Sequence, residues 1–262
     1  MPEQRGYPLD YQAQDYRYIE RPNAVLLSLV EAHLLTSAAT PRILDVGAGA
    51  GANLRAIQRL APSALLTAVE PNAQAAALLK QVCNNVHNGT LQSFLQQHAH
   101  QPFDAVLLSD VVEHVAEPVA FLRALRDEPS LRRALFFVSI PNYAVWYNRL
   151  ATMFGHFEYT WSGLYDRTHL RFFTRASQNR LFSQLGFELI EQRATPSLAQ
   201  SLAPWIRRAF ESDVDAGQHL SLQRSPSYRA YTRFIEPLEA RMCNAWPELL
   251  GFQIVSALRV RR

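Results

Sequence analysis

The sequence contains only two cysteines and a single lysine among its 262 residues. Two thiols, at Cys83 and Cys243, do not form the dense pattern of a disulfide framework, so we expect a reducing, cytoplasmic setting. No apolar run approaches the ~20 residues that a membrane-spanning helix needs. Residues 1–5 also lack the apolar core of a signal peptide. These absences argue against the disulfide-rich secreted and membrane-spanning classes and favour a soluble protein.

An excess of charge of one sign is lacking as well. The formal net charge is +3 and the pI is about 9.0, with no dense basic patch among interleaved aromatic residues, so nucleic acid is not favoured as a partner. The basic residues are almost all arginine, which reflects either coding bias or bidentate recognition of phosphate and carboxylate groups. Hydrophobic residues make up 48%, enough for a sizeable core, and the length suits one α/β domain over residues 1–262.

Short apolar runs alternate with helical patterns along most of the chain, which predicts a parallel sheet covered by helices on both faces. The predicted strands are residues 43–46, 65–69, 86–90, 103–110, 134–140, 187–193 and 252–260. The predicted helices are residues 22–35, 54–60, 72–82, 118–126 and 174–185. Residues 1–21 are interpreted as an N-terminal arm. Residues 195–248, with helical patterns at 198–210 and 228–243, are interpreted as a helical insertion between strands six and seven that caps a substrate or binds a partner.

Three alternating glycines, Gly47, Gly49 and Gly51, join the first predicted strand to the next helix. Glycine lets the backbone turn sharply and approach a ligand closely, and the helix N-terminus adds unpaired N–H groups. Glu70 ends the second predicted strand, where a carboxylate can accept both ribose hydroxyls. The pattern therefore predicts a nucleotide-like ligand. It leaves the cofactor class open, because Gly47, Gly49 and Ala52 also satisfy the dinucleotide fingerprint of NAD(P)-dependent oxidoreductases.

A second group of polar residues follows the fourth predicted strand. Asp110, Glu113 and His114 are separated by three and four residues, so one helical turn is expected to place them on one face. They come just past the carboxyl end of the strand, at the crevice where open α/β sheets bind ligands.

Together these stretches resemble the class I S-adenosylmethionine (SAM)-dependent methyltransferases, in the branch of type 11, 12 and 23 methyltransferase domains. The matching positions are residues 44–51, Glu70, Phe103, Asp104, residues 110–114, Pro141, Asn142 and residues 166–174. The resemblance covers about residues 20–195. At the two histidine blocks the chain is similar to the ubiquinone-pathway O-methyltransferases and the small-RNA 2′-O-methyltransferases. The resemblance implies a Rossmann-like, seven-stranded, mostly parallel sheet with an antiparallel last strand.

The resemblance also implies where SAM would bind. Asp45 and the glycine loop would face its methionine end, and Glu70 its ribose. Family members often have an acidic residue after the third strand for the adenine, but this chain has Gly89-Thr90-Leu91 there, so Thr90 or a backbone carbonyl is expected to serve instead. The predicted cofactor-binding residues are Asp45, Gly47, Ala48, Gly49, Gly51, Glu70, Pro71, Thr90 and Asp110.

The implied reaction is methylation of a hydroxyl on a small molecule, sugar or glycan precursor. Such a hydroxyl must lose its proton, either to a general base or with the help of a metal. A divalent metal such as Mg²⁺, a metal-free histidine base and a purely structural histidine pair are the alternatives at the acidic–imidazole cluster. An NAD(P)-dependent oxidoreductase and a non-catalytic accessory module are the rival functions. The predicted catalytic residues, which are also the candidate metal ligands, are Asp110, Glu113, His114 and His169.

Overall fold

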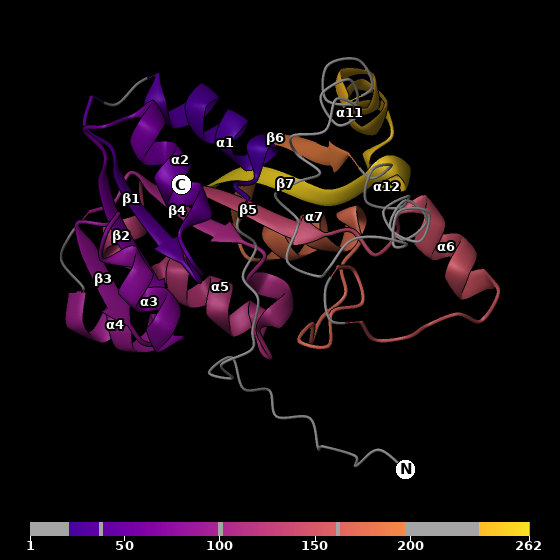
Figure 1. Cartoon of the computed structure of the whole chain (residues 1–262), viewed down its shortest axis with the longest axis horizontal. Helices are drawn as coiled ribbons and strands as arrows, with labels where there is room; N and C mark the ends of the chain where they lie inside the picture. The colour runs from indigo at the N-terminus through magenta and orange to yellow at the C-terminus, as the bar shows by residue number, and fades with distance from the viewer. Residues whose placement is uncertain (1–20, 37–38, 99–101, 161–162, 197–235, 262) are drawn as a thin grey trace, which may run out of the picture.

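The computed structural model describes residues 21–36, 39–98, 102–160, 163–196 and 236–261. Its centre is a seven-stranded sheet in the order β3-β2-β1-β4-β5-β7-β6 (Figure 1). Every strand pair is parallel except the two made by β7, which runs antiparallel to β5 and to β6. The predicted Rossmann-like sheet with an antiparallel last strand is therefore confirmed. The strands are β1 (Arg42–Val46), β2 (Leu65–Glu70), β3 (Asn85–Asn88), β4 (Ala105–Ser109), β5 (Leu135–Pro141), β6 (Phe187–Pro196) and β7 (Gly251–Val260).

Helices connect most of the strands. Two of them begin at residues that favour a helix start. Asn72 caps α3 by accepting from the backbone N–H groups of Gln74 and Ala75, and Pro118 is the first residue of α5. The helices are α1 (Ala24–Val30), continued by a π-helical turn (Glu31–Leu35), then α2 (Ala52–Leu60), α3 (Ala73–Leu79), α4 (Leu91–His98), α5 (Pro118–Asp127), α6 (Trp146–Met153), α7 (Arg175–Gln184), α11 (Glu236–Ala245) and α12 (Pro247–Leu250).

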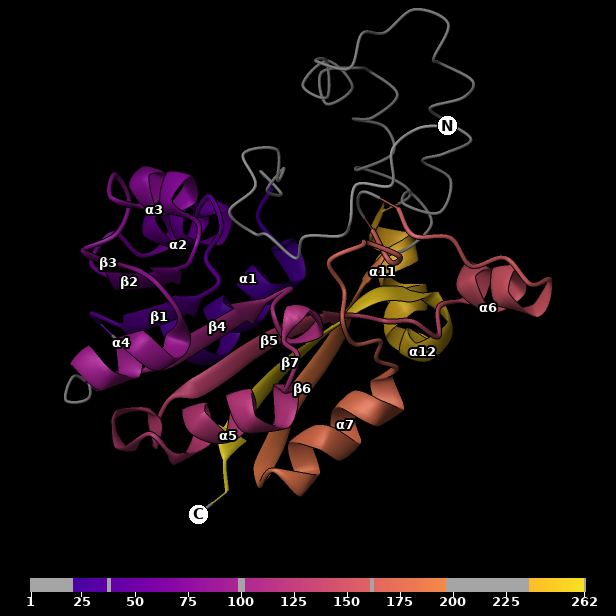
Figure 2. The ribbon, with the colours of Figure 1, turned by 90° about the horizontal axis from the view of Figure 1, so that it is seen from below.

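The alternation of side chains along the strands divides the core between the two sheet faces. The buried even-numbered residues of β1, β4 and β5 pack with side chains of α4, α5 and α7, and Figure 2 shows α5 and α7 on this face. The odd-numbered residues of the same strands pack with α1, α2 and α3. Phe136 and Phe137, consecutive in β5, are both fully buried, one in each of these two clusters. Helices therefore cover both faces, as predicted.

The two loops that carry the predicted site residues leave the sheet on the same side, at the carboxyl ends of the strands. Because β1 pairs in parallel with both β2 and β4, the carboxyl ends of these three strands lie side by side. The glycine loop follows β1, and a 3₁₀ turn (Val112–His114) follows β4. Neighbouring carboxyl ends thus bring the two predicted halves of the site together.

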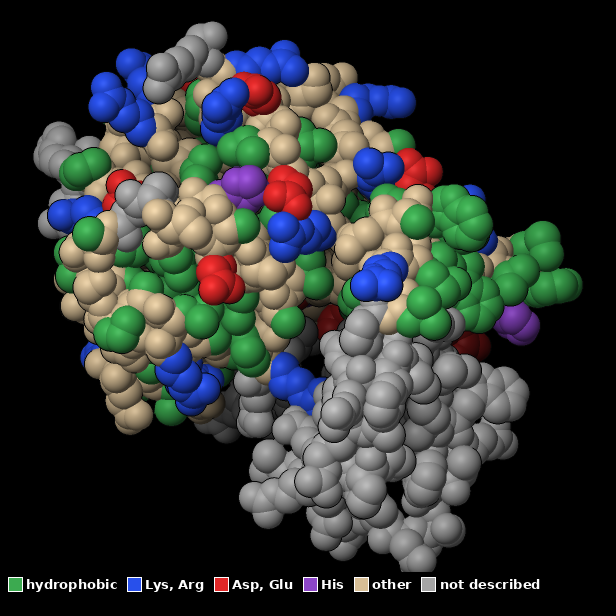
Figure 3. Space-filling view, turned by 90° about the horizontal axis from the view of Figure 1, so that it is seen from above, with side chains coloured by type: hydrophobic (Ala, Val, Ile, Leu, Met, Phe, Trp, Pro, Cys, Tyr) green, Lys and Arg blue, Asp and Glu red, His purple; other side chains and the backbone are tan. Residues whose placement is uncertain are grey.

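Helix α6 lies at the opposite end of the molecule from β3 and α4 and projects away from the sheet (Figures 1 and 2). Hydrophobic side chains gather at this end in the space-filling view (Figure 3). Leu150, Met153 and Phe154 are 46%, 68% and 71% exposed. None of the helices in the described ranges is both long enough and apolar enough to cross a bilayer.

Several boundaries differ from the prediction. Helix α4 was not predicted, and the helix expected over residues 22–35 changes to π-helical geometry after Val30. Strand β6 continues to Pro196 instead of ending at 193. The expected arm at residues 1–21 and the helical pattern at 198–210 lie outside the described residues, apart from Arg21. The part of the expected insertion that the structure describes, from residue 236 onward, forms helices α11 and α12. The single-domain organisation stays a prediction.

Candidate active site

The glycine loop is held by backbone hydrogen bonds to the neighbouring strand. All three glycines have positive φ, at 71° for Gly47, 54° for Gly49 and 82° for Gly51, a region that favours glycine over other residues. The N–H of Gly47 donates to the Val69 carbonyl at 2.8 Å. A Cβ added at Gly47 would lie 2.7 Å from the side chain of Val111, so this loop packs directly against the turn after β4.

Glu70 ties the glycine loop to the loop after β2. Its side chain is 3% exposed, with Oε2 accepting from the Gly49 N–H at 2.8 Å and Oε1 accepting from the Asn72 N–H at 2.9 Å. A carboxylate oxygen can accept more than one hydrogen bond, so both oxygens keep capacity for ligand hydroxyls. Pro71, the next residue, is exposed at the start of this loop.

Asp45 is buried beneath the same loop. It is 2% exposed, and no described residue donates a hydrogen bond to its Oδ1. Burial, together with the nearby Glu70 carboxylate, raises the pKa of Asp45 to about 8. An uncompensated buried carboxyl group costs free energy, and a cationic ligand group is the partner that would remove this cost.

Thr90 has a local role. Its hydroxyl oxygen accepts from the Ser93 N–H at 3.2 Å and its carbonyl accepts from the Phe94 N–H at 3.0 Å, so it caps α4. Its predicted part in adenine binding stays a prediction. The cap shows why residues 91–98 are helical although their few apolar positions did not indicate it.

Asp110 has the only positive φ of a residue other than glycine within the described ranges, at 55°. Its Oδ1 accepts from the side chains of Gln253 at 2.7 Å and Ser139 at 3.2 Å, while its N–H donates to the Ser139 carbonyl at 3.1 Å. Burial raises the pKa of Asp110 to about 6, and the hydrogen bonds from Ser139 and Gln253 oppose that rise. The expectation that one helical turn carries Asp110 with Glu113 and His114 is wrong, because Asp110 lies before the 3₁₀ turn in a left-handed conformation.

Glu113, His114 and His169 form the cluster that the sequence predicted, without Asp110. One side-chain ligand atom from each lies within 4.8 Å of the other two. Glu113 is 1% exposed, and neither of its carboxylate oxygens has a hydrogen-bond partner among the described residues. Burial, with the nearby Asp110 carboxylate, raises the pKa of Glu113 well above its ordinary value. The three groups can therefore share a proton or a cation.

The two imidazoles are oriented by backbone carbonyls. His114 Nδ1 lies 3.1 Å from the Thr168 carbonyl, and His169 Nδ1 lies 3.1 Å from the Leu164 carbonyl. Because a carbonyl only accepts, each neutral ring carries its proton on Nδ1 and its lone pair on Nε2. Burial lowers the pKa of His114 to about 4 and also lowers that of His169, which favours the neutral form of both rings.

A network of backbone bonds holds the His169 loop against the turn after β4. The Glu113 carbonyl accepts from the N–H groups of Leu170 and Arg171 at 2.8 and 3.0 Å. Asp166 accepts from the N–H and hydroxyl of Thr168 at 2.9 and 2.6 Å. This network brings together residues more than fifty positions apart in the chain.

Aromatic rings continue from the histidines toward solvent. The ring centroid of Phe172 lies 6.5 Å from that of His169 and 6.0 Å from that of Phe157, and Tyr143 lies 4.9 Å from Phe172. Phe157 and Phe172 are 43% and 37% exposed. The sequence places these rings in separate segments, so only the fold shows that they share one surface.

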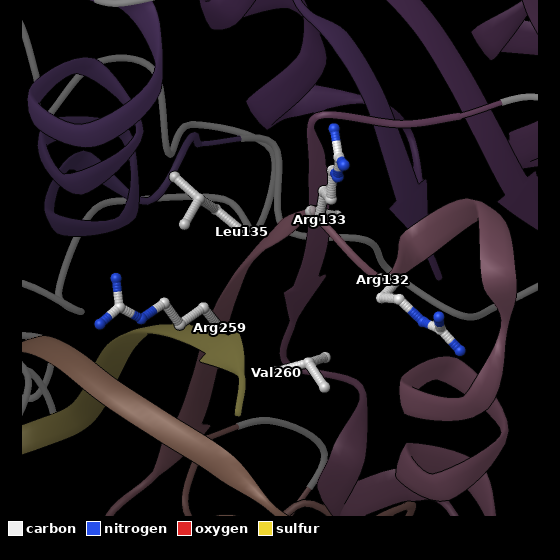
Figure 4. A pocket seen from close by; sticks show the side chains of 6 residues that line it. Arg132, Arg133, Leu135, Arg259 and Val260 are labelled. Atoms are coloured by element: carbon white, nitrogen blue, oxygen red, sulfur yellow. The ribbon is translucent and has the colours of Figure 1, made fainter. Parts of the chain in front are cut away.

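A hollow at the other edge of the sheet does not belong to this site. It is lined by Arg132, Arg133, Arg259 and their neighbours, where β5 begins and β7 ends (Figure 4). The three guanidinium groups point in different directions in Figure 4, and Arg259 pairs with Glu188 at 2.8 Å. The hollow therefore does not concentrate charge at one point.

A family model described as "Methyltransferase domain" matches residues 15–192, which is more than half of the chain. The chain belongs to the class I SAM-dependent methyltransferase family. Membership in this methyltransferase family favours SAM over a nicotinamide dinucleotide as the partner of the glycine loop. No curated protein sequence matches the chain.

Solved structures of the same fold are distant in sequence. A SAM-dependent methyltransferase from Archaeoglobus fulgidus is 14% identical, with a TM-score of 0.53 over 93% of this chain and 95% of that chain. The plantazolicin methyltransferase BpumL, solved in complex with a monoazolic desmethylPZN analogue and S-adenosylhomocysteine (SAH), is 16% identical, with a TM-score of 0.54 over 91% and 83% of the two chains. The [4+2]-cyclase SpnF is 14% identical, with a TM-score of 0.53 over 94% and 86%. At these identities the likeness shows the fold alone.

Two residues of the site, Ser139 and Gln253, were not predicted from the sequence. Ser139 is the fifth residue of β5, and Gln253 lies near the start of β7 opposite Pro141. Both contact Asp110, but neither lies in a motif, and Gln253 is 143 positions away from Asp110. Only the antiparallel pairing of β7 with β5 brings Gln253 to this edge.

Proposed function

We propose that this methyltransferase family member binds SAM and methylates a hydroxyl of a small molecule, sugar or glycan precursor. The observation that carries the proposal is the packing of Gly47 against Val111, which places the glycine loop beside the turn that bears Glu113 and His114. A cofactor in the loop and an acceptor at the imidazoles would then be neighbours. Holding two reactants in such a geometry supplies much of the rate enhancement for a displacement reaction.

The residues of the cofactor side fit SAM. The unpartnered Asp45 Oδ1 suits the cationic amino group of the methionine end, and the Glu70 carboxylate suits the two ribose hydroxyls. When bound, SAM supplies an activated methyl group on a sulfonium leaving group. The left-handed φ angles of the three glycines set the course of the loop, and the missing Cβ atoms of Gly47 and Gly51 let it pack against Val111 and Leu79.

On the acceptor side, the chain must manage the hydroxyl proton. Neutral His114 and His169 both present an Nε2 lone pair, so either ring can accept that proton as the oxygen attacks. The lowered pKa of His114, about 4, makes it a weak base that is always in the accepting form near neutral pH. The exposed rings of Phe157 and Phe172 offer an apolar surface for the rest of the acceptor.

A divalent metal such as Mg²⁺ is the second candidate for promoting loss of the proton from the acceptor hydroxyl. It is favoured by the unpartnered carboxylate of Glu113 beside two imidazoles whose Nδ1 atoms face carbonyls, the arrangement that orients histidine ligands in metal sites. Asp110, the fourth expected ligand, is not part of this group, and its Oδ1 accepts from Ser139 and Gln253. A bound metal would make the acceptor oxygen more acidic.

The test combines binding and turnover. Calorimetry with SAM and with NAD separates the methyltransferase from the oxidoreductase, and NAD binding without SAM binding would defeat the proposal. Formation of SAH with a panel of hydroxylated acceptors separates an enzyme from a non-catalytic module, a distinction that matters because the fold also serves the cyclase SpnF. Chelation followed by metal add-back decides the second candidate, since an unchanged rate removes the metal.

A further inference from the structure

The Asp110 side chain is held in an unusual way. Its two side-chain hydrogen bonds, from Gln253 and Ser139, both end on Oδ1. Its Oδ2 has no hydrogen-bond partner among the residues that the structure describes. A left-handed φ on an aspartate is sparsely populated and persists where neighbouring contacts impose it. The contacts thus fix one carboxylate oxygen and leave the other available to a ligand.

Gln253 also belongs to a longer chain of hydrogen bonds. Its Oε1 accepts from Asn23 Nδ2 at 3.1 Å, and the Asn23 N–H donates to Asn53 Oδ1 at 2.8 Å. Asn53 lies in the first turn of α2, directly after the glycine loop. Asn23 is also the N-cap of α1, with its Oδ1 accepting from the Leu26 N–H at 3.1 Å. Four residues from distant parts of the sequence, with the Asn23 backbone N–H as one of the links, therefore connect the cofactor helix to the end of β4.

We propose that Gln253 is a positioning residue of the cofactor site, which fixes the Asp110 carboxylate and couples it through Asn23 and Asn53 to helix α2. The inference rests on the proposed SAM binding and on the prediction from the sequence that Asp110 is one of the cofactor-binding residues. Side-chain amides suit this role, since Gln253 donates to the carboxylate with one end and accepts from Asn23 with the other. Strand β7 thereby contributes to a site whose other parts come from β1, β2 and β4.

A double-mutant cycle on SAH affinity tests the coupling. Gln253→Leu and Asp110→Gly, the latter introducing a residue that tolerates the left-handed φ, are each expected to weaken SAH binding by about tenfold, the scale of one charge-assisted hydrogen bond. The double variant is expected to bind SAH about as weakly as the weaker single variant, because both changes break the same contact. A purely structural role would give losses that multiply, and that result would overturn the proposal.

Gln192→Leu is the matched control. Gln192 is also a half-buried glutamine in the antiparallel part of the sheet, with its amide donating to Asn179 at 2.8 Å and Ser256 at 2.9 Å. We expect its replacement to change SAH affinity less than twofold, as estimated roughly for a residue outside the site. An equal loss in Gln192→Leu and Gln253→Leu would also overturn the proposal.

Asn23→Asp provides a variant that keeps the helix cap. The acid retains the oxygen that accepts from Leu26 but loses the amide donor to Gln253, so SAH affinity is expected to fall about threefold or more while α1 stays capped. Unchanged affinity in both Asn23→Asp and Gln253→Leu, with normal SAH binding by the wild type, defeats this inference alone. Absence of SAH binding by the wild type defeats the proposed function with it.

Discussion

Glu70 and Glu113 are both almost fully buried, at 3% and 1% exposure, yet their surroundings differ. Each oxygen of Glu70 accepts a backbone hydrogen bond, from Gly49 and from Asn72. Neither oxygen of Glu113 has a hydrogen-bond partner in the described parts of the chain. Glu70 is thus satisfied by the loop that it holds, whereas Glu113 is a buried acid whose cost only a proton or a bound group can remove.

The different surroundings of Glu70 and Glu113 suit different kinds of ligand. A carboxylate fixed by the loop it binds is preorganised for a ligand of constant shape, such as a cofactor. An acid next to two neutral imidazoles is arranged for a group that gains or loses charge, such as a hydroxyl that is being deprotonated.

His169→Ala should have the largest effect. Loss of a general base or metal ligand is expected to reduce turnover by roughly 10²–10⁴-fold. SAM affinity should stay near that of the wild type, because His169 lies on the acceptor side. Steady-state SAH formation and calorimetry measure the two quantities. His156→Ala, an exposed histidine of the loop after α6, is the control, and equal turnover losses in both variants would remove His169 from the chemistry.

Glu70→Ala should weaken SAM binding by ~1.5–3 kcal/mol, the range for lost charge-assisted hydrogen bonds. The protein should also become less stable, because the N–H groups of Gly49 and Asn72 lose their acceptor. Calorimetry and thermal unfolding report the two effects. Glu188→Ala removes an exposed glutamate that pairs with Arg259 and should change neither by much. Wild-type SAM affinity in Glu70→Ala would show that the ribose lies elsewhere.

Asp45 should make SAM binding depend on pH. Its pKa is raised to about 8 in the free protein, and a cationic group beside it favours the carboxylate, so binding releases a proton below that pH. Affinity should therefore rise between about pH 6 and pH 8, by at most about tenfold per pH unit, and then level off. Titrations in buffers of different ionisation enthalpy count the released proton. Asp45→Asn should abolish the release, and an identical pH profile in this variant would exclude Asp45 as its source.

Glu113→Leu should change the free energy of unfolding in the opposite direction to Glu70→Ala. Replacing a buried, unpartnered acid by an apolar side chain is expected to be neutral or to stabilise the fold by about 1–3 kcal/mol. Turnover should fall sharply in the same variant. Denaturant unfolding measures the stability, and a marked loss of stability would mean that the Glu113 carboxyl has a partner that supports the fold.

Local features of this molecule could be predicted from the sequence. Gly47, Gly49 and Glu70 lie in one strand–loop–helix–strand unit, where backbone geometry and apolar periodicity determine the structure. The meeting of His114 with His169 was also predicted, but from a family resemblance and not from spacing. The seven-stranded, mostly parallel sheet with an antiparallel last strand was expected from that resemblance as well.

Contacts that depend on long-range pairing could not be predicted. Gln253 reaches Asp110 only because β7 inserts between β5 and β6, and no local pattern encodes that insertion. The left-handed φ of Asp110 broke the expected helical spacing for the same reason, since Ser139 of the neighbouring strand holds its backbone. The short cap at Thr90 was missed because a helix with few apolar residues gives a weak periodic signal.

The most direct test of the account is calorimetric titration of the purified wild-type chain with SAM, with folding verified by circular dichroism. The account predicts saturable binding at one site per chain, accompanied by proton release below pH 8. A folded protein that gives no binding heat with SAM at several temperatures would contradict it.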